Sequence, residues 1–118
     1  MNKLVSIIIR TKNEEKWISS CLRNVFKQEY KSIEVIIVDN ESTDRTVAKA
    51  QAFPVKLITI KNISPGKAIN EGIRASLGEY IVCLSGHCVP VNNQWLGNLI
   101  KDLDSPNVAG IYGRQEPL

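Results

Sequence analysis

Four short polar segments hold the side chains of this 118-residue chain that are best suited to chemistry. They are residues 11–14 (TKNE), 39–44 (DNESTD), 64–67 (SPGK) and 85–88 (SGHC). Carboxylates and hydroxyls can hydrogen-bond a base or a ribose, whereas a lysine and a histidine can bind a diphosphate. The mixture indicates a nucleotide site, provided that the fold brings the four segments together.

Apolar runs alternate with these segments and predict strands. Val, Ile and Leu dominate the runs, and near-continuous runs of this kind are typical of strands buried on both faces of a parallel sheet. The predicted strands cover residues 4–10, 33–38, 55–60, 80–84 and 108–112. Apolar residues at helical spacing predict helices over residues 17–26, 44–51, 64–78 and 95–103.

Two of these helices carry boundary signals. The second is expected to be capped by Ser42 or Thr43. The third is expected to have Ser64 as its cap, Pro65 at its first position and Gly78 as its stop. The apolar stripe of the third helix is predicted to consist of Ile69, Ile73 and Leu77.

The alternation of strands and helices predicts an α/β fold: a doubly wound, mostly parallel sheet with helices on both faces. Ligands of such sheets bind outside the carboxyl ends of the strands. The four polar segments should therefore converge on one crevice. The sequence has no repeat, low-complexity segment or linker, so residues 1–118 are expected to form a single domain.

The composition is that of an ordinary globular domain, with 43% hydrophobic and 23% charged residues. No apolar run approaches the roughly 20 residues that cross a bilayer, and the N-terminus lacks a signal-peptide pattern, so a cytoplasmic location is expected. The net charge of +3 is far below the basic footprint of a nucleic-acid binder. Three cysteines give no disulfide framework, and Cys21 and Cys83 are predicted to be small core residues.

Familiar phosphate-binding loops are absent from the sequence. Gly66 and Lys67 lack the preceding glycine of a P-loop and are followed by Ala68 rather than by Ser or Thr. No G-x-G-x-x-G follows the first predicted strand, which leaves a dinucleotide-binding fold without support. The chain also does not resemble a phospho-acceptor receiver domain, because such a domain has acidic residues directly after that strand.

Four segments resemble the opening of a family 2 glycosyltransferase with the GT-A fold. They are residues 5–15 (VSIIIRTKNEE), 34–46 (EVIIVDNESTDRT), 66–72 (GKAINEG) and 78–84 (GEYIVCL). The most specific piece, VDNESTD at residues 38–44, is similar to the family's V-D-[DN]-x-S-x-D segment. The ending, residues 112–117 (YGRQEP), resembles bacterial members that act on surface polysaccharides. The resemblance spans nearly the whole chain and implies the N-terminal, nucleotide-sugar-binding half of such a protein.

The resemblance implies roles for individual residues. Asp39 would accept a hydrogen bond from the imide N–H of uracil or thymine, since a carboxylate only accepts. Thr11 would contact the nucleotide from the end of the first strand, and Glu41 would reach a ribose hydroxyl. Lys67 would meet the diphosphate near the start of the third helix, where backbone N–H groups favour anions. Asp44, expected in the first turn of the second helix, is interpreted as structural.

The chain departs from the family pattern after the fourth predicted strand. The family carries D-x-D there and uses it to bind a divalent metal that bridges the diphosphate. Here the matching residues are Ser85, Gly86 and His87, so both carboxylates are missing. Ser85 and His87 stay candidates for binding the diphosphate or a metal, and His87 could ligate Mn²⁺ or hydrogen-bond a phosphate when protonated. Whether Mn²⁺ or Mg²⁺ is a cofactor is therefore left open.

The resemblance implies inverting transfer of a sugar from a UDP, dTDP or GDP sugar to a saccharide or lipid-linked acceptor. The setting would be bacterial polysaccharide or cell-envelope biosynthesis, in the cytoplasm or at the inner face of the membrane. Such transfer needs a bound donor, charge stabilisation on the diphosphate and a general base. No residue of 1–118 can be assigned as the base. The chain is therefore expected to be truncated before the acceptor-binding half and to be inactive alone.

Two other classes stay open. One is a non-catalytic sugar-nucleotide-binding module, which the missing D-x-D favours. The other is a nucleotidyltransferase, whose usual glycine-rich phosphate loop is lacking in residues 11–14.

Overall fold

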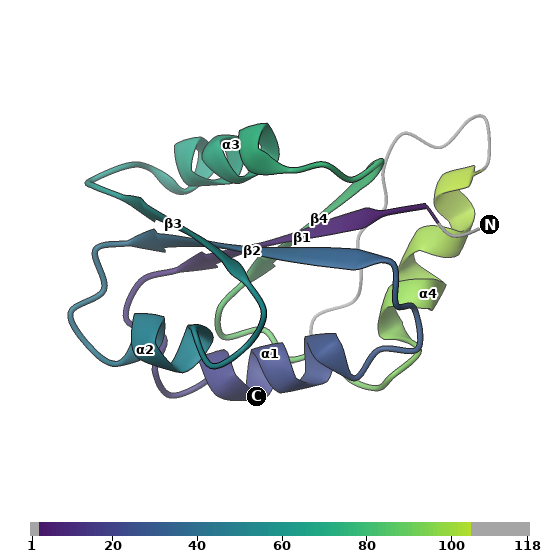
Figure 1. Ribbon diagram of the computed structural model, residues 1–118, viewed down its shortest axis with the longest axis horizontal. Helices are drawn as coiled ribbons and strands as arrows, with labels where there is room; N and C mark the ends of the chain where they lie inside the picture. Colours follow the sequence, from purple (N-terminus) through teal and green to yellow (C-terminus); the bar gives the residue numbers. More distant parts are fainter. Residues whose placement is uncertain (1–2, 105–118) are drawn as a thin grey trace.

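The computed structural model describes residues 3–104 (Figure 1). The strands are β1 (Val5–Thr11), β2 (Ile33–Asn40), β3 (Lys56–Ile60) and β4 (Tyr80–Ser85). The helices are α1 (Ile18–Phe26), α2 (Thr46–Ala50), α3 (Pro65–Ala75) and α4 (Trp95–Ile100), and a 3-10 turn (Lys101–Asp104) follows α4. These elements occur in the predicted order. The expected strand at residues 108–112 and the motif at 112–117 lie outside the described residues.

The described strands are all parallel and lie in the order β3-β2-β1-β4. The chain moves outward from β1 to β2 and β3, and then crosses back to place β4 on the other side of β1. Helices α1 and α2 cover one face of the sheet and α3 covers the other, as Figure 1 shows. The doubly wound α/β prediction is confirmed. Its topological switch point, where such sheets bind ligands, lies between β1 and β4.

Each face of the sheet has its own apolar core, because successive side chains of a strand point to opposite faces. Ile7 and Ile9 of β1 pack with Leu22 and Val25 of α1 in the larger core. The smaller core, under α3, consists of Ile8, Ile36, Val38, Ile60 and Ala68. Burial on both faces explains why the strand sequences are continuously apolar rather than alternating.

Helix α3 packs on the sheet through small residues rather than through its predicted apolar stripe. The buried residues of α3 are Ala68 and Gly72. A Cβ added to Gly72 would lie 2.5 Å from Cγ2 of Ile8, so the helix backbone approaches the sheet as closely as glycine permits. The stripe prediction is therefore wrong: Ile73 is 41% exposed and Leu77 is 78% exposed.

The start of α3 was predicted correctly and its end was not. Ser64 accepts a hydrogen bond from the Lys67 N–H at 3.4 Å, and Pro65 occupies the first position. The helix ends at Ala75 because Ser76 is extended, with a ψ of 150°. The predicted stop, Gly78, instead permits a close contact, since a Cβ there would lie 2.4 Å from Oγ of Ser6.

The start of α2 corrects a second boundary. Asp44, rather than Ser42 or Thr43, accepts a hydrogen bond from the Thr46 N–H, at 2.9 Å. Asp44 also accepts from the Glu15 N–H at 3.2 Å. Desolvation acts to raise the pKa of the Asp44 carboxyl, but the hydrogen bond from the Thr46 hydroxyl, together with these backbone hydrogen bonds, outweighs it and holds the pKa below its ordinary value. The contacts agree with a structural interpretation of Asp44.

The two cysteines differ from each other. Cys21 lies in the larger core, as predicted, and burial raises the pKa of its thiol to about 12. Cys83 is exposed, so its assignment to the core is wrong. Cys83 is on β4, which in the described residues pairs only with β1.

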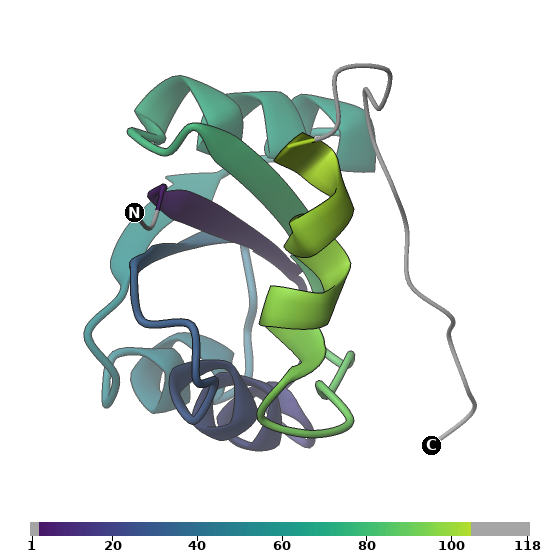
Figure 2. The same cartoon turned by 90° about the vertical axis from the view of Figure 1, so that its right-hand side faces the viewer.

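A buried glutamine joins α4 to α1. Gln28 follows α1, its Oε1 accepts from the Leu96 N–H at 2.9 Å, and its Nε2 donates to the Asn92 carbonyl at 2.6 Å. Leu96 and Ile100 then complete the larger core. Figure 2 shows α4 rising from beside α1 along the β4 side of the sheet.

Glu34, near the start of β2, anchors the turn between α3 and β4. Its Oε2 accepts hydrogen bonds from the Leu77 N–H and from the Ser6 hydroxyl. Partial burial acts to raise the pKa of the Glu34 carboxyl, but these two donors, the charge of Lys56 and the Gly78 N–H together outweigh burial and hold the pKa below its ordinary value. A carboxyl with a lowered folded-state pKa contributes stability above its unfolded pKa and loses that contribution as the pH falls through the folded value.

We therefore expect Glu34→Gln to lower the free energy of unfolding at pH 7 by about 1 kcal/mol. The difference from the unsubstituted chain should shrink as the pH falls from about 5 to about 3, around the ordinary glutamate pKa. Urea unfolding at several pH values measures this, with the exposed Glu79→Gln as the control. A difference that is the same at pH 3 and pH 7 would contradict the assigned charge effect.

Candidate functional site

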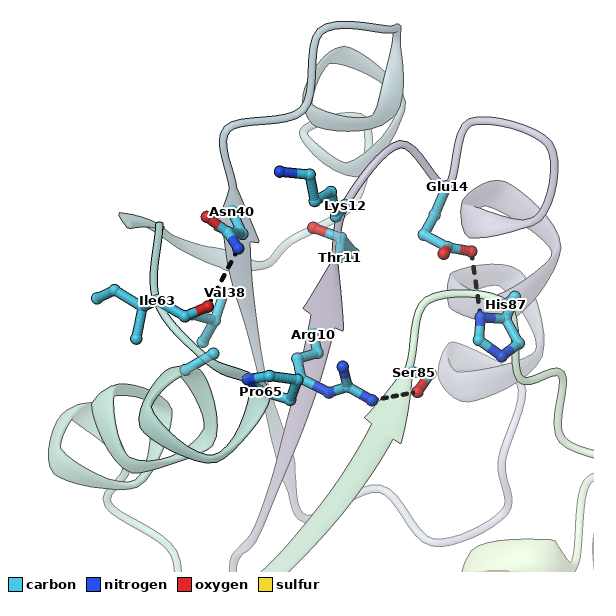
Figure 3. Close-up of a pocket in the computed structure, with 11 residues that line it drawn as sticks. Arg10, Thr11, Lys12, Glu14, Val38, Asn40, Ile63, Pro65, Ser85 and His87 are labelled. Atoms are coloured by element: carbon cyan, nitrogen blue, oxygen red, sulfur yellow. Dashed lines mark hydrogen bonds and ion pairs between the residues drawn. The ribbon is translucent and has the colours of Figure 1, made fainter. Parts of the chain in front are cut away.

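A pocket with a volume of about 320 Å³ lies at the carboxyl edge of the sheet (Figure 3). Residues from all four polar segments line it, so their predicted convergence is confirmed. The lining residues are Arg10, Thr11, Lys12, Glu14, Val38, Asn40, Ile63, Pro65, Ala68, Ser85 and His87. Because the lining comes from β1, β2, β4 and the start of α3, the pocket lies at the switch point of the sheet.

Thr11 and Asp39 form a buried pair at the ends of β1 and β2. They are register partners across the two strands, so their side chains share a face of the sheet. The Thr11 hydroxyl donates to Asp39 Oδ1 at 2.6 Å, and the two residues are 3% and 1% exposed. Ser42 also donates to Asp39, through its hydroxyl at 2.6 Å and through its N–H at 3.0 Å. A carboxylate accepts about four hydrogen bonds, so three donors leave about one acceptor position unfilled.

Arg10 and Ser85 form a second cross-strand pair, on the other face. They are register partners on β1 and β4. Arg10 Nη2 donates to Ser85 Oγ at 3.0 Å, and Figure 3 shows the guanidinium extending across the pocket toward β4. Gly86 follows directly, and a Cβ there would lie 2.9 Å from Cγ2 of Thr11. The glycine thus lets the end of β4 approach the end of β1.

His87 pairs with Glu14 at the mouth of the pocket. His87 Nδ1 lies 3.3 Å from Glu14 Oε2, and the histidine side chain is the more exposed of the two. Within residues 3–104, no group of three or more His, Cys, Asp or Glu side chains is placed to hold a metal ion. The hydroxyl of Ser85, the other candidate in this segment, accepts a hydrogen bond from the Arg10 guanidinium. The donor set therefore does not fit a divalent cation that would be held by the protein.

Three candidates do not line the pocket. Asp39 is one of them, but it is buried, and its carboxylate accepts from Thr11, which does line the pocket. The other two are Glu41 and Lys67. Both are exposed, Glu41 in the loop after β2 and Lys67 in the first turn of α3. Glu41 has a left-handed backbone with a φ of 52°, which is unfavourable for a side chain of its kind. This turn brings Ser42 back onto Asp39.

We expect Glu41→Gly to raise the free energy of unfolding by about 0.5–1 kcal/mol, because glycine adopts a positive φ without the clash of a Cβ. If Glu41 also binds a ribose, the same variant should bind nucleotide more weakly while being more stable. Thermal unfolding and a nucleotide titration of one preparation separate the two effects. Lower stability would contradict the strain interpretation.

Sequence reasoning did not single out Arg10, Lys12 or Asn40 as site residues. Arg10 is the one charged residue of β1 and interrupts the apolar run that begins at Ile7, which is the sequence signal for it. Asn40 donates from Nδ2 to the Ile63 carbonyl at 3.2 Å, and its buried Oδ1 has no partner among the described residues. Lys12 was part of a recognised polar segment, and only the fold shows that it lines the pocket.

The parallel sheet with its pocket at the switch point is the fold of GT-A glycosyltransferase domains, as the comparisons with known proteins show. The chain matches the profile of Glycosyl transferase family 2 over residues 6–116. The chain belongs to this family.

Three similar proteins illustrate the relationship. A glycosyltransferase of Methanococcus voltae, named as a dolichyl N-acetyl-alpha-D-glucosaminyl phosphate 3-beta-D-2,3-diacetamido-2,3-dideoxy-beta-D-glucuronosyltransferase, is 34% identical over 92% of this chain and 38% of its own length. The Escherichia coli UDP-Glc:alpha-D-GlcNAc-diphosphoundecaprenol beta-1,3-glucosyltransferase WfgD is 30% identical over 96% of this chain and 46% of its own length. The solved mannosyltransferase PcManGT of Pyrobaculum calidifontis, in complex with GDP-Man and Mn²⁺, superposes with a TM-score of 0.81 at 28% identity, over 92% of this chain and 34% of that protein.

This chain spans less than half the length of each of these relatives. The match therefore concerns the part of the family that forms the sheet and its carboxyl edge. Among the described residues, no helix is long and apolar enough to cross a membrane.

Proposed function

We propose that this chain is the donor-binding half of an inverting glycosyltransferase, and that the pocket at the carboxyl edge of the sheet holds a nucleoside-diphosphate sugar. The observation that carries the proposal is the buried Thr11–Asp39 pair beside a pocket that contains Arg10 and Lys12. The carboxylate can accept a hydrogen bond from a base, and the two cations can bind the diphosphate of the same ligand.

Asp39 is proposed to bind the base. Thr11 and Ser42 fix the carboxylate from two sides, and about one acceptor position remains for an imide N–H of uracil or thymine. Thr11 positions this carboxylate through its hydroxyl and also lines the pocket. Glu41 and Lys67, on exposed segments near the pocket, are proposed to contact the ribose and the diphosphate. Such contacts would form with the bound ligand, because neither residue lines the pocket without it.

The acceptor and the general base are proposed to belong to a part of the protein beyond this chain. The chain covers only 38% and 46% of the lengths of the two curated relatives, which supports this division. The proposed acceptor is a saccharide or a lipid-linked saccharide, in polysaccharide or cell-envelope synthesis at the cytoplasmic side of the membrane. The name of WfgD, which specifies a diphosphoundecaprenol acceptor, supports that choice. A genomic reading frame that ends at Leu118 would remove the truncation part of the proposal.

A titration calorimetry experiment with UDP, dTDP and GDP tests the donor site. We expect saturable binding of one of them by the full chain, and weaker binding of the matching nucleoside monophosphate. A folded chain that binds none of the three contradicts the donor-site proposal. Binding without sugar transfer by the longest reading frame would instead identify a non-catalytic sugar-nucleotide-binding module, the main alternative.

A further inference from the structure

The Arg10 guanidinium lines the pocket but has no role in the binding of the base by Asp39. Arg10 is partly buried, and it donates to the Ser85 hydroxyl at 3.0 Å. No carboxylate in the described part of the chain forms an ion pair with it. A guanidinium has five N–H donors in a planar fork, and a single neutral acceptor uses few of them. The remaining donors point to an anionic ligand.

The identity of residue 85 decides whether this charge is available. Ser85 is the register partner of Arg10, so any side chain at this position lies beside the guanidinium. A carboxylate there would pair with Arg10 and cancel its charge. The neutral hydroxyl orients the guanidinium and leaves its charge uncancelled.

The groups around Arg10 in the pocket also favour an anionic ligand. Lys12 lines the same pocket, and Pro65 and Ala68 place the first turn of α3 on its wall. The N–H groups of a helix start favour negative charge. Glu14, the acidic side chain of the lining, is paired with His87 rather than with Arg10. Arg10 and Lys12 are two cations against the one carboxylate of Glu14, so the net charge of the lining side chains is positive even with a neutral His87. This charge opposes the binding of a metal cation.

We propose that the donor diphosphate binds in this pocket without a divalent cation, and that Arg10, with Lys12, supplies the positive charge that a metal would otherwise bring. The inference rests on the proposed function and adds the way in which the diphosphate is held. A guanidinium can bind two phosphate oxygens at once. The same charge would stabilise the nucleoside diphosphate as it leaves, because negative charge develops on the diphosphate that Arg10 is proposed to bind.

The test is a titration of the full chain with the nucleoside diphosphate that binds best, in EDTA and in Mn²⁺. We expect the two affinities to agree. Arg10→Gln should lower the affinity for the diphosphate by about 10- to 100-fold, the range for a lost hydrogen bond to a charged group. The affinity for the matching monophosphate should fall less. Arg23→Gln, which removes an exposed arginine of α1, is the matched control and should change neither affinity.

Ser85→Asp provides a second, independent variant. The new carboxylate should pair with Arg10 and repel the diphosphate, so the affinity in EDTA should fall about as far as in Arg10→Gln. Circular dichroism checks that both variants are folded. Diphosphate binding that requires Mn²⁺, or that survives Arg10→Gln unchanged, overturns the inference but leaves the donor site intact. The absence of nucleotide binding under both conditions overturns the proposed function itself.

Discussion

Asp39→Asn is expected to lower nucleotide affinity by about 10- to 100-fold, the range that corresponds to a lost hydrogen bond to a charged group. The amide replaces an acceptor oxygen by an N–H₂ donor, which cannot accept from the imide of a base. It would also place a donor against the Ser42 N–H or against the two hydroxyls that now bind Asp39. The variant should therefore also unfold more easily.

Asp44→Asn is the matched control for this experiment. It makes the same chemical change five residues along the chain, at a carboxylate that accepts from Thr46 and Glu15, neither of which lines the pocket, whereas Asp39 accepts from the lining residue Thr11. Asp44→Asn should lower stability and leave nucleotide affinity unchanged. Calorimetry on both variants, with folding checked by circular dichroism, gives the comparison. Equal affinities for Asp39→Asn and the unsubstituted chain would remove Asp39 from the site.

Gly72→Ala is expected to lower the free energy of unfolding by about 1–3 kcal/mol from overpacking, less the roughly 1 kcal/mol that alanine gains over glycine in a helix. The added Cβ would lie 2.5 Å from Cγ2 of Ile8 and 3.2 Å from Cγ2 of Val38. Helix α3 would have to move away from the sheet. Since Pro65 and Ala68 of α3 line the pocket, nucleotide affinity should fall as well.

Gly66→Ala isolates the packing effect, because it lies in the same helix and nothing lies within 4 Å of the added Cβ. This variant carries the helix-propensity gain without the clash and should be as stable as the parent or slightly more stable. Denaturant unfolding of both variants gives the difference directly. Equal stability of the two variants would contradict the close packing of α3 on the sheet at Gly72.

The strands could be predicted from sequence because burial on both faces leaves a strong signal. The run that contains Ile7, Ile8 and Ile9 is apolar at every position, and β1 is covered by α1 on one side and α3 on the other. The observed strands extend one or two residues further, to Thr11, Asn40 and Ser85, where polar residues continue the hydrogen-bonded ladder. A change to polar residues therefore does not mark the end of a strand, and Thr11 and Asp39 are still buried.

The packing of α3 could not be predicted in the same way. Ile69, Ile73 and Leu77 have helical spacing, but the helix binds the sheet through Ala68 and Gly72, and it ends before Leu77. Predictions from hydrophobic periodicity depend on large apolar side chains. They do not detect a glycine that packs against a sheet because it lacks a side chain. The large apolar residues of this stretch therefore predicted the wrong contact face for α3.

The candidate site was predictable as a location but not as a set of contacts. Polar segments that follow parallel strands meet at one edge of the sheet, and this follows from topology alone. Which side chains touch depends on register: Thr11 faces Asp39, and Arg10 faces Ser85. A shift by one residue would move each side chain to the other face, and strands that are apolar on both faces have no alternation from which the register can be read. Arg10 was overlooked for this reason.

The most direct test of the donor site is an NMR titration of the ¹⁵N-labelled chain with the nucleoside diphosphate that binds best. The account predicts that the amide signals that shift belong to residues 11–14, 39–44, 63–68 and 85–88, around the pocket at the carboxyl edge of the sheet. Signals at the opposite edge, such as those of Lys31 and Ser32 before β2, should not move. Shifts confined to residues away from the pocket, or no shifts at saturating nucleotide, would contradict it.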